Sequence, residues 1–286
     1  TRAMTVNFHT LKSGYVGYGG PGSGNFGHAG RSGKLGGSAP KSGVGGAMSI
    51  VGGRTASARQ AHAAGKEGAM GPGKELMTPE TKQKYDFDAS GDLQSVKTQL
   101  KSFGIGAMAT KDPKLALTKG RIIGEELAGM VARRPGLGKF LENDSMLLYL
   151  SVEKGKTIKN SQGKAVNGTF DHRGGGSIRI ASGLQGHDGL TMGSGSFLVS
   201  GGFKGALRHE YGHAVLTHSS SRVKSDWASV WNKEGGSFAK KVSKYSSTNS
   251  REAFAESFSA WTSSRYGAVS NRALPKEVHA FFEENF

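Results

Sequence analysis

The feature that most constrains the fold of this chain is the segment His209-Glu210-Tyr211-Gly212-His213, which has apolar residues on either side. On a helix, His209 and His213 are one turn apart and lie on the same face. Both imidazoles can therefore reach one metal ion. Glu210 is rotated by about 100° from His209, so it can reach a water molecule on that ion without binding the metal. The alternative is an amphipathic helix that carries two histidines and no metal.

A hydrolytic zinc site needs a third protein ligand and one open position for water. The best candidate for that ligand is Glu252, which lies one helical turn before Glu256 in a segment rich in large apolar residues. Carboxylates among such residues are costly to bury unless a cation or strong donors satisfy them. A solvated helix face with two glutamates is the alternative. His218 follows His213 by five residues and points to a different face, so it is a weaker candidate.

The two motifs together resemble a known family of enzymes. His-Glu-x-Gly-His, then a tyrosine some thirty residues on, then Glu-x-Phe-Ala-Glu, is similar to the catalytic domain of anthrax lethal factor and its relatives. These relatives include the bacterial Pro-Pro endopeptidases, and all are gluzincin metallopeptidases. The resemblance covers about residues 145–286, and its specific parts are 207–216 and 245–261. In the second part, the positions that share the family's residue type are Tyr245, Thr248, Asn249, Glu252, Phe254, Ala255, Glu256 and Phe258.

The resemblance implies a role for each of these polar residues. His209, His213 and Glu252 would bind one Zn²⁺ per chain, and Glu210 would be the general base. Tyr245 would donate a hydrogen bond to the oxyanion, although a partly exposed surface tyrosine is the alternative. Glu256 would orient a metal ligand from behind, or else be a carboxylate favoured by the helix dipole.

The function implied by the resemblance is zinc-dependent endopeptidase activity, in which a metal-activated water hydrolyses a peptide bond of a protein or peptide substrate. Two alternatives belong to other classes. The first is a structural phage head component that retains a zinc site without catalysis, but such a site would need neither Glu210 nor Tyr245. The second is a basic nucleic-acid-binding protein, but the chain lacks a basic motif interleaved with aromatic residues.

The N-terminal part of the chain differs in composition from the rest. Residues 1–80 hold 20 of the 46 glycines, and residues 1–84 carry 11 Lys/Arg against 3 Asp/Glu. Such a segment cannot bury enough apolar surface to offset its ordering entropy, so we expect residues 1–80 to be a flexible basic arm. The stretch 20–38 resembles a glycine-rich segment of tailed-phage head proteins. It implies a particle-attachment segment whose partners are phage head proteins or packaged DNA, whereas a generic linker is the alternative.

Composition limits the remaining choices. The formal net charge of +16 favours polyanionic partners, and the absence of cysteine excludes disulfides. The N-terminus has no apolar segment of the kind found in signal peptides, and the longest apolar run, residues 146–152, is too short to cross a bilayer. We therefore expect no membrane span, and a location in the phage virion or the bacterial cytoplasm.

Periodicity predicts an α+β fold. We expect residues 81–286 to form a mostly helical, zincin-like metallopeptidase domain with a small mixed sheet, with a helical part at 88–144 and a catalytic part at 145–286. The strand at 176–181 is our candidate for the sheet edge that pairs with an extended peptide substrate. The expected elements are helices at 90–103 and 113–134, strands at 145–153, 165–173 and 176–181, a Gly/Ser-rich loop at 183–202, the helix around 207–216, and helices around 225–234, 245–261 and 275–286.

Overall fold

The structure, a computed structural model, describes residues 78–286 except 110, 144–145, 185, 187 and 268–272. The predicted glycine-rich arm, up to residue 77, lies outside the described residues. The first described helix is α2 (Pro79–Lys84), which starts where Thr78 accepts a hydrogen bond from the Thr81 N–H. Pro79 and Glu80, which were predicted to lie in the arm, therefore belong to a helix.

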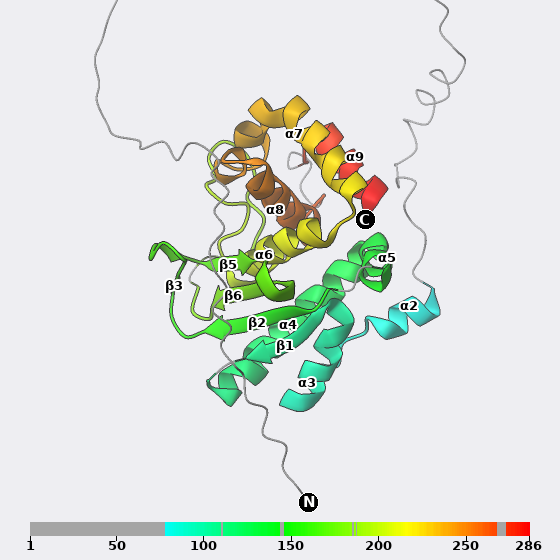
Figure 1. Ribbon diagram of the computed structural model, residues 1–286, viewed down its shortest axis with the longest axis vertical. Helices are drawn as coiled ribbons and strands as arrows, with labels where there is room; N and C mark the ends of the chain where they lie inside the picture. Colours follow the sequence, from blue (N-terminus) through cyan, green and yellow to red (C-terminus); the bar gives the residue numbers. More distant parts are fainter. Residues whose placement is uncertain (1–77, 110, 144–145, 185, 187, 268–272) are drawn as a thin grey trace, which may run out of the picture. The chain divides into compact units, whose positions relative to one another are not determined.

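The described part is α+β, as predicted, with a small mixed sheet among helices (Figure 1). None of the described helices combines the length and the apolar character that crossing a membrane requires. After α2 the elements are α3 (Leu93–Leu100), η1 (Lys101–Phe103), β1 (Ile105–Ala109), α4 (Pro113–Arg133), α5 (Pro135–Asn143), β2 (Leu148–Glu153), β3 (Ile158–Lys159), β4 (Ala165–Val166), β5 (Gly168–Asp171), η2 (Arg173–Gly175), β6 (Ser177–Ala181), α6 (Phe203–His218), α7 (Ser221–Lys241), η3 (Tyr245–Ser247), α8 (Ser250–Trp261) and α9 (Lys276–Asn285).

The main sheet has the strand order β1-β2-β6-β5. β1, β2 and β6 are parallel, and β5 pairs with β6 in the antiparallel sense. The prediction that residues 176–181 form the sheet edge is therefore wrong, because β6 has a strand on each side. Among the described strands the two edges are β1 and β5, and the sequence indicated β5 only as part of a weaker strand at 165–173. The alternation of apolar residues in 176–181 indicates that one face of this strand is buried. It does not indicate which strands pair with it, or whether it lies at the edge of the sheet.

One face of the sheet forms the core against α4 and α6. Leu150 and Ile178 are opposite each other on β2 and β6, and both are fully buried. Tyr149, which points to the other face, is 46% exposed. α4 is fixed at its start by Asp112, whose Oδ1 accepts hydrogen bonds from the first turn, and by proline at the first helical position, as predicted. The sheet therefore has one buried face, and α6 lies on it beside β6 and β5.

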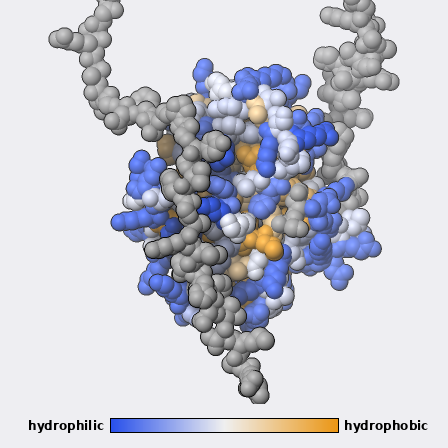
Figure 2. Space-filling model, viewed as in Figure 1, coloured by the Kyte–Doolittle hydropathy of each residue, from blue (hydrophilic) through white to orange (hydrophobic). Residues whose placement is uncertain are grey.

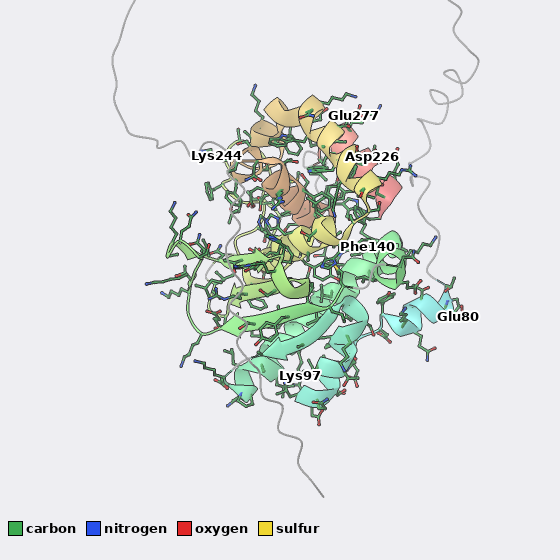
Figure 3. All side chains as sticks on the ribbon, viewed as in Figure 1. Glu80, Lys97, Phe140, Asp226, Lys244 and Glu277 are labelled. Atoms are coloured by element: carbon green, nitrogen blue, oxygen red, sulfur yellow. The ribbon has the colours of Figure 1, made fainter. Side chains whose placement is uncertain are left out.

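The C-terminal helices pack around a cluster of aromatic rings. Trp227 of α7 is 2% exposed, and its ring lies 5.2 Å from the rings of Phe254 and Phe281. Trp227 therefore packs α7 on the core, and Phe281 lies on the buried face of α9. Phe140 of α5 is labelled in Figure 3. Its ring lies edge-on to that of Phe286 at 5.5 Å between centroids, so α5 packs against the last residue of the chain.

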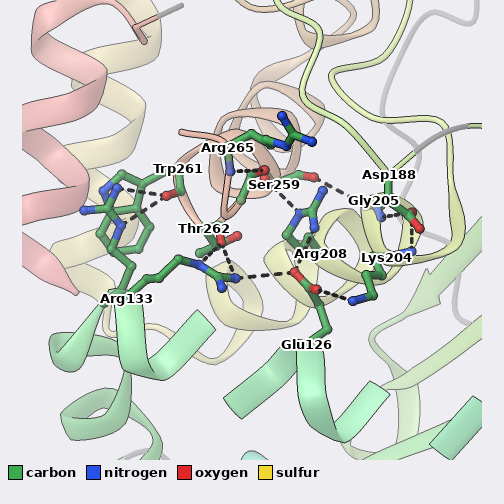
Figure 4. Close-up of polar contacts among 12 residues, drawn as sticks. Glu126, Arg133, Asp188, Lys204, Gly205, Arg208, Ser259, Trp261, Thr262 and Arg265 are labelled. Carbon is green, nitrogen blue, oxygen red and sulfur yellow. Dashed lines mark hydrogen bonds and ion pairs between the residues drawn. The ribbon is translucent and has the colours of Figure 1, made fainter. Parts of the chain in front are cut away.

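A buried ionic cluster links α4, α6 and α8 (Figure 4). The carboxylate of Glu126 lies 2.8 Å from Arg208 Nη1, 3.4 Å from Arg133 Nη2 and 3.5 Å from Lys204 Nζ. Arg208 and Arg133 also donate to the carbonyls of Ser259 and Thr262 at the C-terminal end of α8. Removing one partner of a buried pair typically costs about 3–5 kcal/mol. The cluster therefore holds α6 firmly against α8.

The outer surface is mostly hydrophilic on the face shown in Figure 2, with small hydrophobic areas near its middle. Among the residues that the structure describes, the large hydrophobic side chains that are clearly exposed are Leu147, Tyr149 and Phe197, at 69%, 46% and 64%. Leu147 directly precedes β2, and Tyr149 belongs to it. Phe197 lies in the loop at 183–202, which contains no helix or strand among its described residues.

Candidate metal centre

The close crossing of α6 and α8 sets the site. A Cβ atom at Gly212 would lie 3.1 Å from Ala255 Cα and 3.1 Å from Phe258 Cδ1. These contacts are tighter than nine in ten real Cβ contacts, so a side chain at position 212 would require α8 to give way by a few tenths of an ångström. At the start of α8, Asn249 accepts hydrogen bonds from the N–H groups of Arg251 and Glu252. The helix start is thereby fixed, and Glu252 faces α6.

Three potential ligand atoms converge between these helices. His209 Nε2 lies 3.2 Å from His213 Nε2 and 3.1 Å from Glu252 Oε2, and His213 Nε2 lies 3.3 Å from the same oxygen. A tetrahedral ion with bonds of about 2.0–2.1 Å holds its ligand atoms about 3.3 Å apart. The three atoms thus form an almost equilateral triangle of the size that one ion requires. His209, His213 and Glu252 could hold a metal ion.

The polar environment of Glu252 supports this reading. Glu252 Oε2 is buried and has no hydrogen-bond partner of acceptable geometry. Burial tends to raise the pKa of Glu252, but His209 and His213 outweigh it and lower that pKa. Burial likewise opposes protonation of His209, yet Glu252 and Glu256 raise its pKa well above the usual value. A positive charge is therefore favoured at this point, and a metal ion there would compete with the proton.

Glu256 lies behind His209. Its Oε1 is 2.8 Å from His209 Nδ1, and its Oε2 accepts hydrogen bonds from the Val199 N–H at 2.8 Å and the Ser243 hydroxyl at 2.7 Å. The side chain is almost fully buried, with all of these partners in place. With Nδ1–H donating to Glu256, the lone pair of His209 Nε2 faces the triangle. The structure therefore places Glu256 where it can orient a ligand.

Glu210 is close to the triangle without belonging to it. It is 7% exposed, and burial raises the pKa of its carboxyl group, while His209 and His213 oppose that shift. The carboxylate lies against β5: a Cβ atom at Gly168 would come within 2.7 Å of Glu210 Oε1. The position of Glu210 beside the edge strand thus depends on the absence of a side chain at residue 168.

Tyr245 lies on the other side of His209. Its ring centroid is 5.8 Å from that of His209, and its N–H donates to the Phe197 carbonyl at 3.0 Å. Burial raises the pKa of Tyr245, and the negative charges of Glu252 and Glu210 raise it further. The hydroxyl therefore stays protonated near neutral pH and can donate a hydrogen bond.

The six predicted site residues lie together in the structure: His209, Glu210, His213, Tyr245, Glu252 and Glu256. His218 does not belong to this group, and its Nε2 lies 3.1 Å from the Gly175 carbonyl oxygen. The sequence did not indicate Gly168, the Phe170 ring stacked 6.4 Å from His213, or the Val199 and Ser243 donors to Glu256. Gly168 and Phe170 lie in a weakly alternating strand, and Val199 lies in a Gly/Ser-rich loop. No local pattern marks any of them.

Comparison of the chain with protein-family models, with curated proteins and with solved structures found no match in any of the three. The functional interpretation therefore rests on the residues of this chain and on their geometry.

Proposed function

We propose that this chain is a zinc-dependent endopeptidase. The observation that carries the proposal is the triangle of His209, His213 and Glu252, with Glu210 and Tyr245 placed beside it but outside the ligand set. Two imidazoles, one carboxylate and an open position are the usual ligand set of zinc hydrolases. A site that only stabilised the fold would need neither a buried neighbouring carboxylate nor a phenol. The resemblance of 207–216 and 245–261 to the lethal factor family supports the same activity.

Zinc at such a site acts as a Lewis acid and lowers the pKa of water towards 7. The side chains around the site transfer the proton and stabilise the oxyanion. Glu210, whose raised pKa suits a base that must also release its proton, accepts the proton of the attacking water and passes it to the leaving amine. The Tyr245 hydroxyl donates to the oxyanion, and one good donor of this kind contributes roughly 3–4 kcal/mol. His209 is held in orientation by Glu256.

Among the described strands, β5 pairs with β6 alone, and its other edge offers a place for the substrate backbone. The Ala181 N–H donates to the Asn167 carbonyl, and the antiparallel register then continues through Gly168 and Phe170. In such a pair, hydrogen-bonded and non-hydrogen-bonded residues alternate. The backbone groups of Gly168 and Phe170 therefore point away from β6, beside Glu210 and His213. An extended peptide can pair with them.

For the biological setting, we propose a phage particle or the bacterial cytoplasm, with phage head proteins or packaged DNA as partners of the N-terminal arm. The support is the resemblance of residues 20–38 and the basic charge of residues 1–84. This part of the proposal concerns residues outside the described structure, and the catalytic proposal does not depend on it.

The proposal is tested by measuring metal content and cleavage together. We expect the purified chain to hold one zinc ion per molecule by elemental analysis and to cleave members of a random peptide library. A zinc chelator should abolish cleavage, and added zinc should restore it, because Glu210 and Tyr245 alone cannot activate water. A chain that holds zinc and cleaves no peptide or protein would refute the enzymatic proposal.

A second prediction concerns Gly168. Replacing it with alanine should lower kcat/KM roughly 10- to 100-fold, because the new Cβ would come within 2.7 Å of Glu210 Oε1 and displace the carboxylate. Zinc content should not change, since the three atoms nearest to the new Cβ all belong to Glu210, which lies outside the ligand triangle. Gly235→Ala is a matched control, because a Cβ at Gly235 meets nothing within 4 Å. Equal activity of the two variants would show that Glu210 tolerates the shift.

A further inference from the structure

Five rings cross the candidate metal centre in succession. Phe170 lies 6.4 Å from His213, His213 lies 4.8 Å from His209, His209 lies 5.8 Å from Tyr245, and Tyr245 lies 5.6 Å from Phe197, all between ring centroids. The three inner rings belong to residues already assigned to ligation or catalysis. The rings at the two ends are apolar phenylalanines. A substrate bound across the ligand triangle would therefore meet an apolar ring on either side.

Phe197 differs from Phe170 in its exposure. Phe170 is partly buried and packs against the core, whereas Phe197 is 64% exposed. A single exposed apolar side chain is common on protein surfaces. Phe197 is informative because its ring lies 5.6 Å from that of Tyr245, at one end of the row of rings. Among the described residues, Leu147 is a second strongly exposed apolar side chain; it precedes β2 and takes no part in the row of rings.

The loop that carries Phe197 is anchored at several points. The carbonyls of Ser196 and Phe197 accept the N–H groups of Lys244 and Tyr245 at 2.9 and 3.0 Å. Two residues farther on, the Val199 N–H donates to the buried Glu256 carboxylate. The Phe197 ring is therefore held beside Tyr245 by backbone hydrogen bonds, so its exposure does not result from a loose loop.

We infer that Phe197 binds a large apolar side chain of the peptide substrate, one or two residues from the scissile bond, and thereby sets the specificity of the enzyme. One ring, that of Tyr245, separates Phe197 from the ligand His209. An extended peptide advances about 3.3 Å per residue, so two residues span about 6.6 Å. A side chain within two residues of the cleaved bond can therefore cross the 5.6 Å between the Tyr245 and Phe197 rings. The inference rests on the proposed endopeptidase activity and names its substrate class: peptides with leucine, phenylalanine or a similar residue at that position.

The test compares kcat/KM for two matched peptide sets, which carry either large apolar residues or alanine and glycine around the cleavage site. In Phe197→Ser, kcat/KM should fall roughly 10- to 100-fold for the apolar set and stay within about threefold for the small set. Phe197→Leu should restore most of the preference. Leu147→Ser, which alters an equally exposed apolar residue elsewhere, should behave like the wild type. Zinc content and the melting temperature should be unchanged in every variant.

The outcomes separate the inference from the function on which it depends. If wild-type protein cleaves peptides and Phe197→Ser retains the same preference, the inference is overturned alone. A uniform loss over both peptide sets would also overturn it, because Phe197 would then act only by supporting Tyr245. Wild-type protein that cleaves neither set nor any library peptide would overturn the proposed function and the inference with it.

Discussion

Replacing Glu210 with glutamine is expected to lower kcat/KM for peptide hydrolysis by roughly 10²- to 10⁴-fold, the usual contribution of a general base. The amide has nearly the same shape as the carboxylate but cannot accept a proton. Glu210 is buried and lies outside the triangle of ligand atoms formed by His209, His213 and Glu252. The variant should therefore bind zinc as the wild type does, and elemental analysis beside the kinetic assay checks both halves of the prediction.

A matched control comes from α4, where Glu125 is exposed to solvent. Glu125→Gln removes the same charge from an exposed position on a helix that carries none of the site residues, so its activity and zinc content should equal those of the wild type. Wild-type activity in Glu210→Gln would show that another group accepts the proton. Loss of zinc from that variant would instead show that Glu210 takes part in binding the metal.

The convergence of His209 and His213 could be predicted from the sequence because the geometry of a helix depends only on residues close together in the chain. The spacing of His209 and His213 predicted that both rings reach one point, and their Nε2 atoms lie 3.2 Å apart. The same reasoning could only propose Glu252, since no periodicity describes how two helices cross. That crossing depends on contacts of Gly212 with Ala255 and Phe258, which join segments more than 40 residues apart. For Glu252, the family resemblance supplied what local patterns could not.

The sheet was harder to predict, for a different reason. Alternating burial predicted a strand at 176–181 correctly but assigned it to the wrong position, because β5 folds back through η2 and covers its free side. β1 (Ile105–Ala109) escaped notice, since its glycine and alanines carry little strand signal. α5 (Pro135–Asn143) was not among the expected elements, although proline is favoured at the first position of a helix. Each error concerns what a segment meets in space.

Replacing Glu252 with alanine is expected to lower zinc affinity by more than about 100-fold. Loss of partners that only orient a ligand already costs about 10- to 100-fold, and Glu252 Oε2 lies within 3.3 Å of both Nε2 atoms. Glu256→Gln provides the comparison, because Glu256 contacts His209 Nδ1 on the side away from the triangle. Competition with a chromogenic zinc chelator should rank the proteins as wild type, then Glu256→Gln, then Glu252→Ala.

Thermal unfolding with and without zinc separates loss of a ligand from damage to the fold. A metal that binds only the folded state stabilises it, by about 2.7 kcal/mol at a free concentration of 100 times Kd. The wild type should therefore melt at a higher temperature with zinc. In Glu252→Ala this increase should disappear. The metal-free melting temperature should be lower than that of the wild type, because the pairing with His209 and His213 that lowers the pKa of Glu252 is lost. A zinc-dependent increase equal to that of the wild type would exclude Glu252 from the ligand set and leave the two histidines in need of a different third ligand.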